Sequence, residues 1–236
     1  MLNITTPYPY KEFKRKTVNG KRLYENPYGD PVPSVTTILS KTKDMTHLNA
    51  WKKRVGEKKA QEIVTEAANV GTVMHEMLEA WSLNEQYTGK NLLQAKMMAE
   101  TVIKNVEPDI TEVWGSEVNL CYPQLYAGTT DLVGIYKGNP CIMDFKQTNK
   151  PKKREWIQDY FCQLGAYCMA HNYVYGTKIQ SGVILMCSKD LLFQKFEVAG
   201  REFVRHQHDF LRKTDQYYQN VPENKQAQGT KNDEKI

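Results

Sequence analysis

The chain lacks the features that mark membrane and secreted proteins. No stretch approaches the roughly 18 consecutive apolar residues that a membrane span needs, and the first residues show no apolar secretory segment. The five cysteines are odd in number and form no Cys-x-x-Cys pair, which argues against a disulfide scaffold and favours reduced thiols in the cytoplasm. The missing organelle transit peptide favours a phage or bacterial source, where the protein is expected in the bacterial or phage-infected host cytoplasm.

Two nucleic-acid modules are also missing. There is no Gly-x-x-x-x-Gly-Lys-Ser/Thr loop, so the chain has no helicase motor of its own. There is no helix-turn-helix or zinc-finger pattern either, which argues against recognition of a specific base sequence.

The composition is that of an ordinary globular protein with an uneven charge distribution. Of 236 residues, 40% are hydrophobic and 25% are charged, which suits one large domain or two small ones. Residues 1–60 carry 13 basic and 5 acidic side chains, whereas residues 61–131 carry 3 and 11. A basic flank attracts phosphates and an acidic centre can hold metal ions; the alternative is an ordinary solvated surface.

Hydrophobic periodicity predicts an α/β fold with a mixed sheet. Helices are expected over residues 70–83, 92–106, 155–171 and 200–218, and strands over 113–120, 129–136, 141–146, 179–187 and 191–198. Residues 1–69 are expected to form a basic, mostly helical extension that packs on a core of residues 70–218, with short β-prone pieces before residue 33. The tail, residues 219–236, has few large apolar residues and is expected to be disordered.

The strands before and after residues 137–140 form a hairpin that gathers charged side chains. Asp144 and Lys146 are two residues apart and share one face of a strand. A four-residue turn places Asp131 opposite Lys146, and a two-residue turn places it opposite Asp144, so the three groups converge in either register. Two carboxylates on a half-buried strand suit Mg²⁺ or Mn²⁺, and the alternative is a surface ion pair.

Four segments resemble motifs of one nuclease superfamily. Gly-Thr-Thr-Asp at 128–131 and Asp-Phe-Lys at 144–146 resemble the second and third motifs of the PD-(D/E)XK nucleases, with Asp in place of the commoner Glu. Residues 71–79 resemble the GTxxHxxxE helix of the RecB-like branch, and 163–167 its QxxxY motif. Residues 33–39, with Trp51, resemble the start of the mitochondrial genome maintenance exonuclease family and its phage and bacterial relatives.

The resemblance implies a restriction-endonuclease-like core that works with Mg²⁺ or Mn²⁺. It assigns Asp131 and Asp144 as metal carboxylates, with His75 and the carbonyl of Phe145 as further ligands. Lys146 is then the catalytic lysine. For His75, the alternative is a hydrogen-bonded core histidine.

The same resemblance gives Gln163 and Tyr167 the task of positioning the phosphate or the attacking water. Their spacing of four residues places both on one face of a helix, and core packing is the alternative for Tyr167. Glu117 is weighed as an accessory carboxylate, but a solvated strand residue is the preferred reading.

An iron–sulfur cluster, which some members of this branch hold, is not expected here. No cysteine precedes Cys121, and only Cys187 follows the helix of the QxxxY motif. Four thiolate ligands in the required order are therefore not available.

Hydroxyl and basic side chains are candidates for contacts with the DNA backbone. They are Ser34, Thr36, Thr37, Thr148 and Lys150. The sequence therefore predicts a metal-dependent DNA exonuclease that prefers single-stranded ends and acts in replication, recombination or repair. The alternatives are a structure-specific or flap endonuclease on the same site, and a non-catalytic DNA-binding protein with a nuclease fold. The expected partners are DNA and a helicase, single-strand-binding or replication protein, and no membrane.

Overall fold

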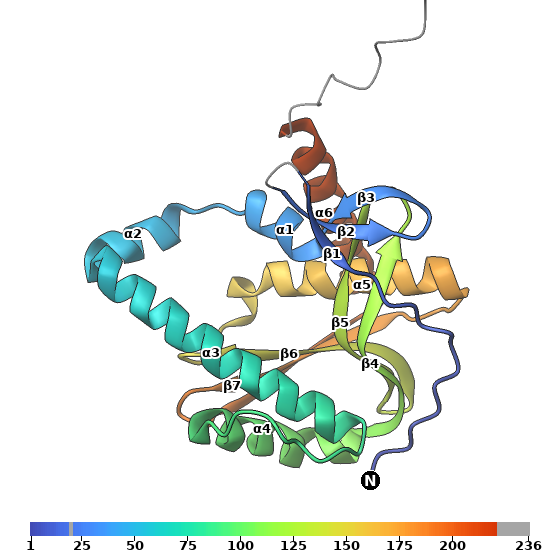
Figure 1. Ribbon diagram of the computed structural model, residues 1–236, viewed down its shortest axis with the longest axis horizontal. Helices are drawn as coiled ribbons and strands as arrows, with labels where there is room; N and C mark the ends of the chain where they lie inside the picture. The colour runs from blue at the N-terminus through green and yellow to red at the C-terminus, as the bar shows by residue number, and fades with distance from the viewer. Residues whose placement is uncertain (19–20, 221–236) are drawn as a thin grey trace, which may run out of the picture.

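A computed structural model describes residues 1–18 and 21–220 (Figure 1). The tail expected to be disordered falls almost entirely outside these residues, so that expectation stays a prediction. Within the described ranges no helix has the length and apolar character that a membrane crossing requires.

The main sheet has five strands in the order β4-β5-β6-β7-β8. The strands are β4 (Ile110–Tyr122), β5 (Tyr126–Tyr136), β6 (Asn139–Thr148), β7 (Ser181–Ser188) and β8 (Phe193–Ala199). β7 runs parallel to β6, and the other neighbours are antiparallel. A parallel neighbour needs a crossover, which the helix α5 provides. The predicted mixed α/β fold is confirmed, and its hairpin, crossover helix and returning strand fit a restriction-endonuclease-like core.

Helices cover both faces of this sheet. α3 (Glu57–Ser82) and α4 (Leu93–Val106) pack on one face, where Met143 and Phe145 of β6 contribute to the core. α5 (Gln158–Tyr175) and α6 (Gly200–Asn220) pack on the other face, where Ile142 of β6 is buried. Two short 3₁₀ helices, η1 (Glu107–Asp109) and η2 (Arg154–Trp156), precede β4 and α5. Because both faces of β6 are covered, Asp144 on this strand is fully buried and Lys146 is half-buried.

The β5–β6 hairpin has the shorter of the two turns that the sequence allowed. Tyr136 pairs with Asn139, so only Lys137 and Gly138 lie between the strands. Both have positive φ, +48° and +77°, as a two-residue turn that matches strand twist requires. This register points Asp131 toward Asp144.

The N-terminal part is less helical than predicted. β1 (Arg15–Val18), β2 (Lys21–Asn26) and β3 (Gly29–Pro33) form a three-stranded antiparallel sheet, followed by α1 (Val35–Lys41) and α2 (Thr46–Val55). Tyr24 and Val32 of this small sheet pack against Cys121 and Ala127 of the main sheet.

The helix predicted from residue 70 begins at residue 57, so the expected boundary at 69–70 lies inside α3. The first half of α3 buries Ala60 but exposes most of its other side chains, and it therefore lacks the apolar periodicity on which the prediction depends. The helix predicted over 155–171 instead spans 158–175, because its first residues form η2.

Candidate nuclease site

The site lies where β5 and β6 separate. Their paired residues run from Tyr136–Asn139 to Leu132–Met143, and the ladder ends one residue before Asp131 and Asp144. Beyond that point the Phe145 N–H donates a hydrogen bond to Asp131 Oδ2 over 2.6 Å. The Asp131 carboxylate thus replaces a backbone carbonyl as the acceptor for the Phe145 N–H. The carboxylates of Asp131 and Asp144 lie at the point where the two strands separate.

α3 brings His75 to this opening. His75 Nδ1 lies 3.5 Å from Asp131 Oδ1, so the structure joins two of the predicted ligands. Burial opposes charge on both groups, but their mutual attraction outweighs it: the pKa of Asp131 is lowered and that of His75 is raised. Asp131 is therefore held as a carboxylate.

Glu117 is the third member of a group of possible metal ligands, although the sequence favoured a solvated residue at this position. It lies on β4 between the pairs Ser116–Leu132 and Val118–Thr130, and so faces Asp131. His75, Glu117 and Asp131 each offer a ligand atom within 4.8 Å of the others. The preferred reading of Glu117 as a solvated residue is wrong, because the β4–β5 register that brings it here is not encoded in a local motif.

Burial and the neighbouring Asp131 carboxylate raise the pKa of Glu117 to about 7. The backbone at Glu117 also has φ +49°, a left-handed conformation that is costly for a residue with a Cβ. Strain of this kind concentrates at functional sites. Both features fit a carboxylate held in place for ligand binding.

Asp144 and Lys146 form the second half of the site. Asp144 is fully buried, and its Oδ2 forms an ion pair with Lys146 Nζ. Burial raises the pKa of Asp144 to about 6, and Lys146 opposes this shift. Asp144 Oδ1 has no hydrogen-bond partner among the described residues, which leaves coordination capacity in a place where an unpartnered carboxylate oxygen is expensive.

These donors fit a divalent cation. Carboxylate oxygens suit Mg²⁺ or Mn²⁺, and one imidazole widens the choice toward Mn²⁺. His75, Glu117 and Asp131 would hold the ion, with Asp144 beside them although it is not part of the 4.8 Å group. Such an ion polarises a phosphodiester and acidifies a water. The ligand role of the Phe145 carbonyl stays a prediction.

Gln163 and Tyr167 lie together on α5, as their spacing predicts. Gln163 Nε2 donates to Tyr167 Oη over 3.4 Å, and both side chains are buried. Tyr167 packs against Gly128 of β5, where an added Cβ would stand only 2.9 Å from its ring. Burial raises the pKa of Tyr167 despite the hydrogen bond from Gln163, so the hydroxyl stays protonated and can donate.

The five residues proposed to contact DNA have mixed environments. Ser34 and Thr148 are buried, whereas Thr36 and Lys150 are exposed. Ser34 caps α1 by accepting from the Thr37 N–H over 2.9 Å, and Thr148 Oγ1 donates to the Lys150 carbonyl over 2.9 Å. Ser34 and Thr148 thus have structural roles, and DNA contact by any of the five stays a prediction.

Comparison with known proteins supports the predicted resemblance. No protein-family profile matches the chain. It is 31% identical over 176 residues to human "Mitochondrial genome maintenance exonuclease 1", covering 67% of this chain and 50% of the relative. The chain is a homologue of mitochondrial genome maintenance exonuclease 1. The protein of the same name from Xenopus tropicalis is 30% identical over 172 residues, covering 67% of this chain and 49% of that relative.

The chain thus spans about half the length of the mitochondrial genome maintenance exonuclease 1 proteins that it matches. Among solved structures, a "putative exonuclease" from Eubacterium rectale has a TM-score of 0.42 and 12% identity over 62% of this chain and 68% of that one. The sequence relatives therefore carry the assignment.

Proposed function

We propose that the protein is a Mg²⁺- or Mn²⁺-dependent DNA exonuclease that hydrolyses phosphodiester bonds and prefers single-stranded ends. The observation that carries this proposal is the meeting of His75, Glu117 and Asp131 with the Asp144–Lys146 pair where two strands part. The name of its relatives supports an exonuclease. A role in DNA replication, recombination or repair agrees with genome maintenance in the same name.

Lys146 acts as a cation in this proposal. Burial disfavours its charge, but Asp144 and Asp131 more than offset burial and raise the pKa of the Lys146 ammonium. A fixed ammonium stabilises negative charge that develops on a phosphate during attack by water. Gln163 and the protonated Tyr167 can orient the phosphate or the water through hydrogen bonds.

α2 supplies a surface for the DNA backbone. None of its residues is buried within the described structure, and its last turn carries Lys52, Lys53 and Arg54. Contacts of this kind follow phosphates without reading bases, which suits an enzyme that degrades DNA of any sequence.

The test is cleavage of end-labelled DNA by the full chain with Mg²⁺, Mn²⁺ or EDTA. Linear single strands, linear duplexes, flapped duplexes and circular single strands are compared, with Asp144→Asn as the inactive variant and the exposed Asp190→Asn as its matched control. We expect metal-dependent loss of linear single strands, intact circles, and at least about a 100-fold loss of rate in Asp144→Asn only. Labels at the 5′ and 3′ ends give the direction.

Other outcomes decide between the alternatives. Cleavage of circles or release of intact flaps identifies an endonuclease on the same site. DNA binding without cleavage by either metal rejects the enzymatic proposal and leaves a DNA-binding protein with a nuclease fold.

A further inference from the structure

A second group of ligand-type side chains lies between α5 and α6. Cys162 comes from α5, and His206 and Asp209 come from α6; each offers a ligand atom within 4.8 Å of the other two. Cys162 faces α6, whereas Tyr167 on the same helix packs against Gly128 of β5. The group is thus separate from the carboxylates of the proposed nuclease site.

His206 is the unusual member of the group. It is 1% exposed, and within residues 21–220 neither ring nitrogen has a hydrogen-bond partner. Its Nδ1 lies 3.8 Å from Asp209 Oδ2, and its Nε2 lies 3.9 Å from Glu202 Oε1; both distances are too long for hydrogen bonds. A buried imidazole without partners destabilises a fold, so it calls for an explanation.

The spacing suits a shared metal ion better than a hydrogen bond. Zn²⁺ binds nitrogen and oxygen ligands at about 2.0–2.2 Å and sulfur at about 2.3 Å, so two tetrahedral ligands stand roughly 3.4–3.6 Å apart. The 3.8 Å between His206 Nδ1 and Asp209 Oδ2 is close to that separation. One thiol, one imidazole and one carboxylate are also ligand types that Zn²⁺ takes.

We propose that Cys162, His206 and Asp209 form a Zn²⁺ site that ties α5 to α6. Cys162 binds as a thiolate and releases its proton to solvent, and a water fills the fourth position. Asp209 is partly exposed, with 26% of its side chain accessible, so the ion enters from its side. The site fixes the helix that carries Gln163 and Tyr167, and it goes beyond the proposed nuclease function.

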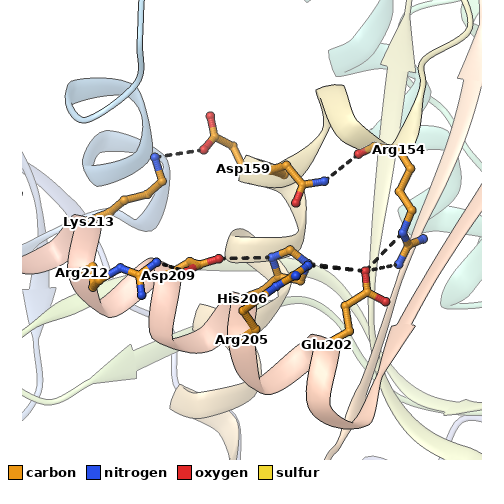
Figure 2. Close-up of polar contacts among 9 residues, drawn as sticks. Arg154, Asp159, Glu202, Arg205, His206, Asp209, Arg212 and Lys213 are labelled. Atoms are coloured by element: carbon orange, nitrogen blue, oxygen red, sulfur yellow. Dashed lines mark hydrogen bonds and ion pairs between the residues drawn. The ribbon is translucent and has the colours of Figure 1, made fainter.

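The surroundings of His206 support this assignment. In Figure 2 the imidazole ring lies between Asp209 and Glu202, with one ring nitrogen toward each carboxylate. Arg154 Nη2 holds Glu202 Oε1 over 2.9 Å, so Glu202 is anchored outside the ligand group. A metal-bound histidine commonly has a carboxylate on the side of its second ring nitrogen, and Glu202 lies on that side at 3.9 Å, beyond hydrogen-bond distance.

The first experiment uses Co²⁺ as a spectroscopic probe of the full-length protein after removal of metals with a chelator. A thiolate ligand gives a sulfur-to-cobalt charge-transfer band, which carboxylates and imidazoles of the nuclease site cannot produce. We expect this band to reach a plateau as Co²⁺ is added, to persist in Asp144→Asn and to disappear in Cys162→Ala. Cys168→Ala, which removes another buried cysteine of α5, is the matched control and should keep the band.

The second experiment measures Zn²⁺ affinity by competition with a coloured chelator and the unfolding midpoint with and without Zn²⁺. Asp209→Asn removes a partly exposed ligand, and we expect it to weaken Zn²⁺ binding at least 10-fold while the metal-free midpoint stays near that of the parent. Zn²⁺ should raise the midpoint of the parent by more than that of Cys162→Ala, in which only the nuclease site can still bind the ion. A folded parent without the cobalt band, a band that survives in Cys162→Ala, or unchanged affinity in Asp209→Asn would each overturn the three-ligand site.

Discussion

Glu117 combines two costs at a single position. Its backbone is left-handed at φ +49°, and its carboxyl is buried beside Asp131. Neither feature stabilises the metal-free fold, since like charges in a half-buried site repel and a left-handed residue with a Cβ is strained. Costs of this kind persist where function requires them.

Replacing this carboxylate should separate stability from activity. We expect Glu117→Gln to reduce nuclease activity at least about 10-fold, because a metal donor is lost. In EDTA its free energy of unfolding should rise on the order of 1 kcal/mol, because repulsion between buried carboxylates is relieved. Urea unfolding and cleavage assays on the same preparation test both. A destabilised variant, or one with full activity, would contradict a role as a ligand.

Two motif glycines should respond to alanine in opposite ways. At Gly128 a Cβ would stand 2.9 Å from Tyr167 Cε1 and 3.0 Å from its Oη, whereas at Gly71 the nearest such contact is Gln147 Cβ at 3.8 Å. We expect Gly128→Ala to destabilise the protein by about 1–3 kcal/mol through overpacking and to displace Tyr167. Gly71→Ala should stabilise α3 by about 1 kcal/mol, because alanine favours a helix interior. Urea unfolding of the two variants measures both effects. Equal destabilisation would show that contact with Tyr167 does not determine the effect of an added Cβ.

Local strand geometry brings Asp144 and Lys146 together, whereas long-range strand pairing places Glu117 in the site. Strand alternation predicts that Asp144 and Lys146 share a face, since they are two residues apart on one strand, and the resemblance to the nuclease motifs assigned their roles. Glu117 enters only through the pairing of β4 with β5. Long-range register is set by tertiary packing, so no local spacing pointed to it.

At the scale of elements, strong periodicity and turn chemistry gave the best predictions. The hairpin register could be narrowed to two choices, and the positive φ of Lys137 and Gly138 decides between them. The continuity of α3 across residue 70 was not predicted, because its exposed first half has no apolar stripe that would join it to the helix expected over 70–83. The N-terminal sheet was read only as short β-prone pieces, since its pairing depends on packing against the main sheet.

The end of α5 is closed by the N-terminal segment, and this contact should make stability depend on pH. His171 is fully buried and contacts Tyr10 Oη over 2.9 Å and Thr177 Oγ1 over 2.8 Å. Burial lowers its pKa from 6.5 to about 4. The folded state therefore holds it neutral while the unfolded chain binds a proton, so this stability is complete above about pH 6.5 and is lost as pH falls toward 4.

The loss of unfolding free energy from His171 should reach about 2 kcal/mol by pH 5. Urea unfolding at pH 7 and pH 5 measures it. His171→Gln should flatten the pH dependence by that amount, although it lowers stability at pH 7. The exposed His208→Gln is the control and should retain the parent slope. An unchanged slope in His171→Gln would show that His171 does not determine the pH response.

At the scale of the whole molecule, acidic and basic side chains are concentrated in different parts of the chain. The acidic middle of the chain supplies Glu117 and Asp131 to the site, and the basic N-terminal part supplies the exposed cations of α2. α2 precedes α3, the helix that carries His75, so one continuous stretch links the basic surface to the cluster. In the proposed function, the separation of these cations from the carboxylates would let the protein attract phosphates without neutralising the metal donors.

The salt dependence of DNA affinity tests whether the cations of α2 contact the DNA backbone. Binding to single-stranded DNA weakens with salt by about 0.7 logarithmic units per phosphate contact and per tenfold change in salt. We expect the combined variant Lys52→Ala, Lys53→Ala, Arg54→Ala to flatten the slope of log affinity against log salt by about 2, and to weaken binding to all sequences alike. Fluorescence anisotropy at several salt concentrations, in EDTA to prevent cleavage, gives the slope.

The matched control removes three exposed cations elsewhere. They are Lys104, Lys178 and Arg201. Both triple variants lose the same net charge, so a general effect of charge on long-range attraction would lower their affinities equally. If α2 contacts the backbone directly, only its own variant changes the slope, because counterion release counts local phosphate contacts rather than net charge. Equal slopes in the two variants would show that α2 does not contact the DNA backbone. The DNA would then approach the carboxylates over another surface of the protein.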